Sequence, residues 1–356
     1  MRPATICFAF MAAFGSLHPA AAAEKAPPLP WSAPATTEVV VEDRKFANGD
    51  VELSGTLHMP RSGQPVAAVV VTHSASSPLR AASLYDHLKT ILPALGIAVF
   101  TYDRRGSGQS GTQDAGGNFT ILADDAIAAV KHLKTDPRID PRRIGTWGLS
   151  QGGWISPLAA SRSPDIAFVV AVSAPVVTAD VQMIFSSTNH LKANGYSETD
   201  IAQMVAARKA VDDYMRGTVS RAEAQAKLDA IKTKPWFKYL YMGETFRDRE
   251  VSGWRKEIEN DPLVNLKAVT VPTLILYGAD DAVVPVADSA RRLKAIAPQM
   301  PNMDAHVIAG ADHAMQMSAD LETSLDPKHD GTERPDSPEY FALLASWLAA
   351  HGFAGD

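Results

Sequence analysis

The stretch GTWGLSQGG, residues 145–153, places one serine between two glycines directly after an apolar run. The residues before it predict a strand, and residues 154–160 predict a helix. A serine at a sharp strand-to-helix turn projects its hydroxyl away from the sheet, and the turn has room only for small residues two positions before and after it. Gly148 and Gly152 occupy those positions. Ser150 is therefore the predicted nucleophile.

Strand and helix patterns alternate through most of the remaining chain. Strands are predicted at 38–41, 51–57, 67–72, 97–102, 143–147, 167–172, 272–277 and 306–308, and helices at 84–95, 119–133, 154–160 and from Ser337 to Gly352. The first two strands, with Asn48-Gly49 as the turn, predict an antiparallel start. The later apolar runs are typical of strands buried on both faces. This order predicts an α/β fold with a mostly parallel central sheet and helices on both faces.

Residues 175–271 interrupt the alternation with amphipathic helix patterns and an aromatic cluster at 236–242. We predict that they form a helical lid over the ligand end of the sheet, and that most of these aromatics serve the lid's own core. The predicted organisation is a signal peptide (1–23), an extended leader (24–37), two parts of the α/β core (38–174 and 272–356), and the lid insertion (175–271) between them.

The N-terminus has the composition of a secretory signal. Met1-Arg2 is basic, residues 6–17 are apolar, and Ala20 to Ala23 provide cleavage sites. The apolar run is shorter than the ~20 residues that span a bilayer, so we expect export to the periplasm or the medium without stable membrane insertion. The single cysteine, Cys7, lies inside this run, which would leave the mature chain without thiols.

The net charge of −6 and the absence of a basic run argue against nucleic acid as a partner. Residues 106–111 satisfy the G-x-G-x-x-G pattern of dinucleotide sites. That pattern requires a helix to open at the glycines, whereas residues 112–117 contain further helix-breaking residues. We predict a loop there and no organic cofactor or metal, and the oligomeric state stays open.

A serine nucleophile needs a base, and the base needs an acid that orients it. Ligand sites of open parallel sheets lie beyond the carboxyl ends of the strands. Asp280 and Asp281 follow the strand at 272–277, and His313 follows the strand near 306–308. His313 is the predicted base. Either aspartate can be the acid on position alone.

The negative charge that develops on the substrate oxygen requires hydrogen-bond donors. The backbone N–H of Gln151, at the start of the helix, is one predicted donor. The second should come from the loop HSASSP, residues 73–78, where we expect the amide of Ser74, with that of Ala75 as the second choice.

Four motifs together resemble the α/β-hydrolase superfamily, and within it the serine aminopeptidase and dienelactone-hydrolase-like esterases. They are YDRRGSGQS at 102–110, GLSQGG at 148–153, Gly278 with Asp281 and Pro285, and Asp312-His313. The resemblance implies a triad of Ser150, His313 and Asp281, with the acid three residues after Gly278. One departure is that Ser74 and Ser76 replace the glycines of the family's H-G-S-G-P loop.

The sequence thus predicts an exported serine hydrolase that cleaves small or medium carboxylic esters through an acyl-enzyme. A peptidase or amidase with the same triad is the alternative within the enzymes. A binding protein without turnover is the alternative from another class.

Overall fold

The computed structural model describes residues 37–115, 117–325 and 334–355, and the predicted signal peptide and nearly all of the leader lie outside these ranges. One eight-stranded sheet runs through the described chain in the order β1-β2-β4-β3-β5-β6-β7-β8. The strands are β1 (Val39–Asn48), β2 (Val51–Pro60), β3 (Val66–Thr72), β4 (Ile97–Tyr102), β5 (Ile139–Leu149), β6 (Val169–Val172), β7 (Thr273–Gly278) and β8 (Met303–Ile308). Strand β2 is antiparallel to β1 and β4, and the other neighbours are parallel. The predicted α/β fold is confirmed.

The antiparallel start differs from the prediction by one residue at its turn. Asn48 still pairs with Val51, so the turn consists of Gly49 and Asp50. Gly49 has a φ of 59°, a conformation that glycine adopts without steric cost.

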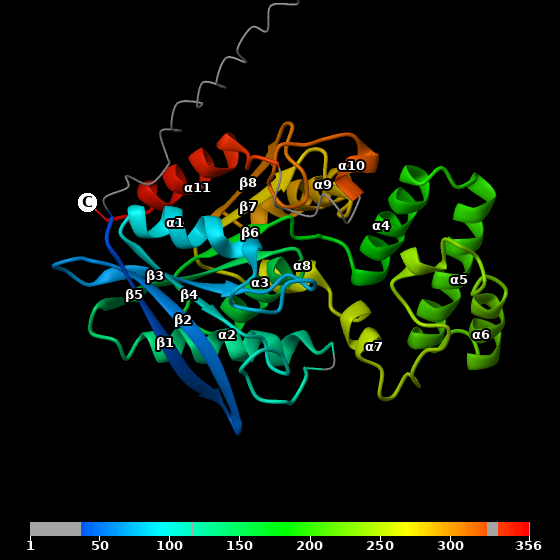
Figure 1. Cartoon of the computed structure of the whole chain (residues 1–356), viewed down its shortest axis with the longest axis horizontal. Helices are drawn as coiled ribbons and strands as arrows, with labels where there is room; N and C mark the ends of the chain where they lie inside the picture. The colour runs from blue at the N-terminus through cyan, green and yellow to red at the C-terminus, as the bar shows by residue number, and fades with distance from the viewer. Residues whose placement is uncertain (1–36, 116, 326–333, 356) are drawn as a thin grey trace, which may run out of the picture.

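Helices cover both faces of the sheet (Figure 1). They are α1 (Asp86–Ala94), α2 (Phe119–Leu133), α3 (Gln151–Arg162), α4 (Ala179–Ala193), α5 (Glu198–Arg216), α6 (Arg221–Asp229), α7 (Gly253–Ile258), α8 (Pro262–Lys267), α9 (Val286–Ile296), α10 (Leu321–Leu325) and α11 (Pro338–Ala350), with short 3₁₀ turns η1 (Ser83–Tyr85), η2 (Phe237–Leu240) and η3 (Ala297–Gln299).

Strand β3 shows how the sheet divides the core. Val70 belongs to the apolar cluster that includes α2 and α3, whereas Val69 and Val71 belong to the cluster that includes α1 and α11. Successive side chains of a strand point to opposite faces, so a wholly apolar strand can fill two cores at once. All seven residues of β3 are buried.

The chain between β6 and β7 contains α4 to α8, and we call residues 175–271 the helical segment. In Figure 1 its helices α4, α5, α6 and α7 extend beyond the sheet on one side. It has an apolar cluster of its own that includes Met204, Trp236 and Leu240. The aromatic stretch 236–242 therefore contributes to a local core, as expected for most of its residues.

The glycine-rich stretch at 106–111 is a loop, as predicted. Gly106 and Gly108 have φ values of 75° and 53°, and the next helix, α2, begins only at Phe119. Ser110 donates its hydroxyl to the Asp103 carbonyl at 2.6 Å, which folds the loop back on its own start. No helix within the described ranges is long and apolar enough to cross a membrane.

Candidate active site at the carboxyl ends of the central strands

Ser150 lies between the last residue of β5 and the first residue of α3. Its backbone adopts φ 57° and ψ −115°, a sparsely populated conformation for a residue with a side chain. Such strain persists only where the surroundings impose it, and it is concentrated at functional sites. The Ser150 hydroxyl does not cap the helix, so helix formation does not occupy it.

The two flanking glycines are required by close backbone contacts. A Cβ atom on Gly148 would lie 2.2 Å from both the Gly152 carbonyl oxygen and Thr72 Oγ1. A Cβ on Gly152 would lie 2.3 Å from the Thr72 carbonyl oxygen. The prediction that only small residues fit two positions before and after Ser150 is therefore confirmed.

Asp281 and His313 meet beyond the ends of β7 and β8. The His313 Nδ1–H donates to Asp281 Oδ2 at 2.8 Å. The other carboxylate oxygen, Oδ1, accepts the backbone N–H groups of Val283 and Val284 at 2.7 and 2.8 Å. Asp281 is fully buried and thus held in one orientation. Asp280, the competing aspartate, is exposed, and the hydrogen bond selects Asp281 as the partner of His313.

The pKa of His313 reflects two opposing influences. Desolvation is the larger single influence and disfavours the protonated ring, but the charge and hydrogen bond of Asp281, together with the charge of Asp312, outweigh it and raise the pKa above its ordinary value. Asp312 is itself fixed by the backbone N–H groups of Ala314 and Gln316, both at 2.9 Å.

Hydrogen bonds across the strand ends bring Ser150 and His313 to one edge of the sheet. The Ser150 N–H donates to Val172 O on β6 at 2.9 Å, and the Ser173 N–H donates to Leu276 O on β7 at 2.8 Å. The Ser173 hydroxyl then donates to the His313 carbonyl at 2.8 Å. In the part of the chain that the structure describes, no hydrogen bond joins the Ser150 hydroxyl to the His313 ring.

In the loop after β3, the amide predicted as the second oxyanion donor has a partner within the protein. The Ser74 N–H donates to the Tyr85 hydroxyl at 3.1 Å, and that hydroxyl donates to the Ser77 carbonyl at 2.7 Å. This contact occupies the amide that we predicted as the second oxyanion donor. Among the described residues no hydrogen bond engages the N–H of Ala75, the second choice, which is exposed.

Arg104 is a residue of this edge that the sequence prediction missed. Its Nη2 donates to the carbonyls of His73 and Ser74 at 3.2 and 3.3 Å, and to Gln151 Oε1 at 2.7 Å. It thereby joins the loop after β3 to the residue after Ser150. The only sequence signal was its place in the motif that follows β4, where the next residue, Arg105, is occupied by an ion pair with Asp125.

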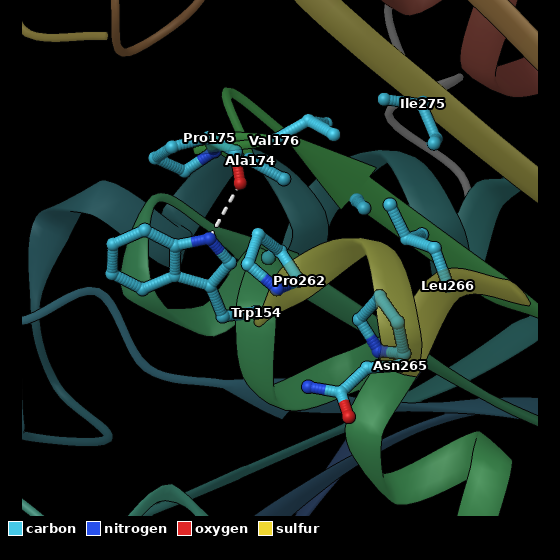
Figure 2. Close-up of a pocket in the computed structure, with 11 residues that line it drawn as sticks. Trp154, Ala174, Pro175, Val176, Pro262, Asn265, Leu266 and Ile275 are labelled. Carbon is cyan, nitrogen blue, oxygen red and sulfur yellow. Dashed lines mark hydrogen bonds between the residues drawn. The ribbon is translucent and has the colours of Figure 1, made fainter. Parts of the chain in front are cut away.

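A small apolar pocket lies between α3, α8 and the end of β6. Figure 2 shows Trp154, Pro175, Val176 and Pro262 around it, with the Trp154 indole N–H donating to the Pro175 carbonyl at 2.5 Å. It offers no acid or base for chemistry, and it is distinct from the edge with Ser150. No cluster of three or more metal-ligating side chains occurs within the described ranges.

Parts of the chain are similar in sequence to known proteins. The thiohydrolase apmlB of Arthrinium phaeospermum is 35% identical over 126 residues, which cover 35% of this chain and 40% of that protein. A non-heme chloroperoxidase of Burkholderia pyrrocinia is 28% identical over 211 residues, 55% of this chain and 68% of that protein. Mouse (Mus musculus) monoglyceride lipase is 32% identical over 136 residues, 38% of this chain and 43% of that protein. The chain thus matches less than half the length of the thiohydrolase and of the lipase.

Solved structures share the fold at low identity. An α/β hydrolase of Penicillium aligns with a TM-score of 0.56 at 19% identity, over 88% of this chain and 99% of that chain. An esterase of Pyrococcus furiosus aligns with a TM-score of 0.54 at 19% identity, over 90% and 92%. The sequence model of the family described as serine aminopeptidase, S33 matches residues 63–320. Since this match covers well over half of the chain, the protein belongs to the serine aminopeptidase S33 family of α/β-hydrolases.

Proposed function

We propose that the protein is a serine hydrolase that cleaves carboxylic esters with Ser150, His313 and Asp281. The observation that carries the proposal is the 2.8 Å hydrogen bond between His313 and the buried Asp281, at the same edge as a serine held at positive φ. The similar proteins include an esterase, a lipase and a thiohydrolase. Each of these names describes a hydrolytic enzyme.

In the proposed cycle Ser150 Oγ attacks the acyl carbon and its proton passes to His313 Nε2. Asp281 holds the Nδ1 proton, which leaves Nε2 as the basic nitrogen, and its charge stabilises the imidazolium. The imidazolium then protonates the departing alcohol oxygen, and the acyl group remains on Ser150. A water molecule, deprotonated by His313, releases the acid and restores the serine.

Two backbone amides would stabilise the oxyanion. The Gln151 N–H is the first of helix α3 and has no carbonyl one turn earlier in the helix to accept it. For the second donor we replace Ser74 with Ala75, because Tyr85 engages the Ser74 amide. A donor of this kind contributes a factor of about 10²–10³ to the rate.

We further propose that the helical segment acts as a lid. Its helix α4 is fastened to the loop that carries the acid: Gln182 Nε2 donates to the Val283 carbonyl at 2.9 Å, and Asn189 Nδ2 donates to the Ala282 carbonyl at 2.8 Å. Side chains of the segment therefore stand beside Asp281, at a suitable place to shape the substrate site.

Export of the chain is also a proposal, and it rests on the basic start, apolar run and alanine-rich end of residues 1–23. Expression in a bacterial host followed by fractionation tests it. A periplasmic or extracellular product whose mass lacks the first 23 residues is expected, and a full-length cytoplasmic product would refute it.

Turnover of p-nitrophenyl esters from acetyl to palmitoyl tests the proposed reaction. We expect the wild type to hydrolyse these esters, and we expect kcat/KM to fall by at least about 10³-fold in Ser150→Ala. Ser161→Ala is the matched control, because Ser161 lies on the same helix and its hydroxyl donates a hydrogen bond to the Leu158 carbonyl. Activity that survives in Ser150→Ala would overturn the assignment.

A comparison of amide with ester substrates separates this function from a peptidase. For the proposed esterase, kcat/KM for p-nitrophenyl esters exceeds that for aminoacyl p-nitroanilides by orders of magnitude. The reverse order would favour the peptidase, which the family name keeps as the second candidate.

A further inference from the structure

The loop after β3 packs against the turn that carries Ser150. Thr72 pairs with Gly148 in the parallel ladder of β3 and β5, so the residues after Thr72 begin beside the nucleophile turn. A Cβ atom on Gly152 would lie 3.1 Å from the His73 carbonyl oxygen. The loop and the start of α3 are therefore in direct contact, as is required of two segments that each supply one oxyanion donor.

Arg104 binds both of these segments through one nitrogen atom. Its Nη2 donates to the carbonyl oxygens of His73 and Ser74 at 3.2 and 3.3 Å. The same atom donates to Gln151 Oε1 at 2.7 Å. Because Nη2 has two hydrogens and three acceptors, at least one hydrogen is shared. The Arg104 backbone N–H also donates to the Pro78 carbonyl at 2.8 Å. Arg104 thus holds the loop at its beginning and its end and joins it to the first residue of α3.

The hydrogen bond to the Ser74 carbonyl determines the direction of the next amide. A peptide unit is planar and trans, so the carbonyl of Ser74 and the N–H of Ala75 point in opposite directions. The carbonyl accepts from Arg104 and, at 3.3 Å, from the Ser77 N–H. The Ala75 N–H consequently points away from the guanidinium. It belongs to an exposed residue, and no hydrogen bond engages it in the described part of the chain.

The composition of the loop shows why its peptides need such support. Residues 73–78 contain no glycine, and none of them adopts a positive φ. The direction of their amides is therefore set by hydrogen bonds and not by a left-handed residue in the turn. Hydrogen bonds from a charged donor are about twice as strong as those between neutral groups. A guanidinium is thus an effective group to fix these carbonyls.

We propose that Arg104 is a positioning residue that sets the direction and spacing of the two oxyanion donors, the backbone amides of Ala75 and Gln151. It acts on the first through the Ser74 carbonyl and on the second through the Gln151 side chain, and it touches no reacting atom. This inference rests on the proposed ester hydrolysis and adds a residue to its machinery. Since the oxyanion exists only in the transition state and the tetrahedral intermediate, the contribution of Arg104 should affect kcat and not KM.

Arg104→Met tests the proposal with p-nitrophenyl butyrate as substrate. Methionine keeps much of the length of the side chain and removes its charge and its donors. We expect kcat to fall by about tenfold, part of the effect of a lost oxyanion donor, because the Ser77 N–H still holds the Ser74 carbonyl. KM should change little, and Arg104→Lys should keep part of the rate.

Arg142→Met is the matched control for this substitution. The Arg142 side chain is 87% exposed and pairs with Asp140, so its loss should leave both constants unchanged. If the wild type hydrolyses the ester and Arg104→Met has the same kcat, this inference fails and ester hydrolysis stands. A wild type without turnover would overturn both.

A double-mutant cycle with Ala75→Pro separates positioning from a general structural role. Proline has no N–H, so Ala75→Pro removes the proposed donor and should lower kcat by about 10²–10³-fold. Addition of Arg104→Met should then cost much less than it costs in the wild type, because the amide that it positions is gone. Independent effects multiply, so the same factor in both backgrounds would contradict the proposal.

Inhibition by two neutral analogues of the butyryl group provides a second readout. 1,1,1-Trifluoropentan-2-one forms an oxyanion when Ser150 adds to it, whereas butyramide binds without one. Arg104→Met should weaken inhibition by the ketone about as much as it lowers kcat, and it should leave inhibition by butyramide unchanged. Equal weakening of both would indicate a distorted site and overturn the inference.

Urea denaturation shows whether Arg104→Met folds. If it does not, Gln151→Leu carries the same tests, because it removes one acceptor of Arg104 and keeps both the guanidinium and the Gln151 backbone amide. We expect a lower kcat, an unchanged KM and a selective loss of inhibition by the ketone. An unchanged kcat in this variant would contradict the role of the Gln151 side chain and with it the proposal.

Discussion

The pair of Asp281 and His313 at the edge of the sheet and the interior of the helical segment differ in how completely their polar atoms are paired. At the edge, both oxygens of Asp281 accept hydrogen bonds, one from His313 and the other from two backbone amides. In the segment, Arg208 Nε, Asp212 Oδ2 and Asp180 Oδ1 are buried without partners. The first region is organised before any substrate arrives, and the second has unused hydrogen-bonding capacity.

This difference separates chemistry from selectivity. Groups that stabilise a transition state act best when they are already fixed, because no reorganisation is then required during the reaction. Groups that select a substrate gain their energy from contacts that only the right ligand makes. We infer that the fold fixes the proposed reaction, and that the helical segment sets the choice of substrate.

The largest expected effect is at the catalytic edge, in Asp281→Asn. An asparagine at this position cannot hold the required tautomer or stabilise the imidazolium, so kcat should fall by about 10⁴-fold. Asp280→Asn is the matched control, since Asp280 is adjacent and exposed, and it should retain nearly full activity. Ester hydrolysis by the purified variants measures both, and equal losses would contradict the choice of Asp281.

Gly148→Ala should show how tightly the edge is packed. The added methyl would meet the Gly152 carbonyl and Thr72 Oγ1 at 2.2 Å, and overpacking of this kind lowers the free energy of unfolding by about 3 kcal/mol. Urea denaturation measures it. Gly63→Ala is the control, because nothing lies within 4 Å of a Cβ there. A similar small change in both variants would show that the turn can relax.

Asp212→Asn probes the helical segment through the pH dependence of stability. Burial raises the pKa of Asp212 to about 6, so the folded protein binds this proton more tightly than the unfolded chain does. The free energy of unfolding should therefore fall as the pH rises from about 4 to about 6. The amide has no charge to desolvate, and it keeps the oxygen that accepts the Trp254 indole.

Relative to the wild type, Asp212→Asn should thus gain about 1–2 kcal/mol at pH 7.5 and nothing near pH 4. Denaturation at both pH values measures the difference. Asp213→Asn is the control, because Asp213 pairs with Lys209 at the helix surface. A gain of the same size at both pH values would show that the unpaired Asp212 charge is not its source.

The smallest effect is expected from Tyr85→Phe in the loop after β3. This change leaves the Ser74 N–H and the Ser77 carbonyl without their partner, but it does not touch the Ala75 amide. We expect kcat/KM for p-nitrophenyl butyrate to fall only a few-fold. A clear rise in kcat/KM would return the role to Ser74, because the change frees the Ser74 N–H to donate to the oxyanion.

Much of the fold was predictable because the spacing of apolar residues along the sequence matches the faces that strands and helices bury in an α/β core. The apolar run that became β3 and the spaced apolar residues of α2 are examples. The pairing of His313 with Asp281 could also be anticipated, since parallel strands deliver the residues after them to one edge. Choosing between Asp280 and Asp281 required the family resemblance, and in the structure the buried Asp281, not the exposed Asp280, bonds His313.

Side-chain contacts between distant segments were not predictable. The Tyr85 hydroxyl that binds the Ser74 amide comes from a different turn, and no pattern in either segment indicates the contact. Arg104 and Arg208 each keep a buried Nε atom without a hydrogen-bond partner, although they belong to different layers of the fold. Periodicity marks Arg208 as a residue of an amphipathic helix, but it cannot show that its Nε is buried without a hydrogen-bond partner.

Labelling of the purified protein with a fluorophosphonate, followed by peptide mass spectrometry, tests the central proposal most directly. We predict a single phosphonylated residue, Ser150, with labelling abolished in Ser150→Ala and strongly slowed in Asp281→Asn. An unlabelled wild-type protein, or an adduct on another serine, would contradict the proposed nucleophile.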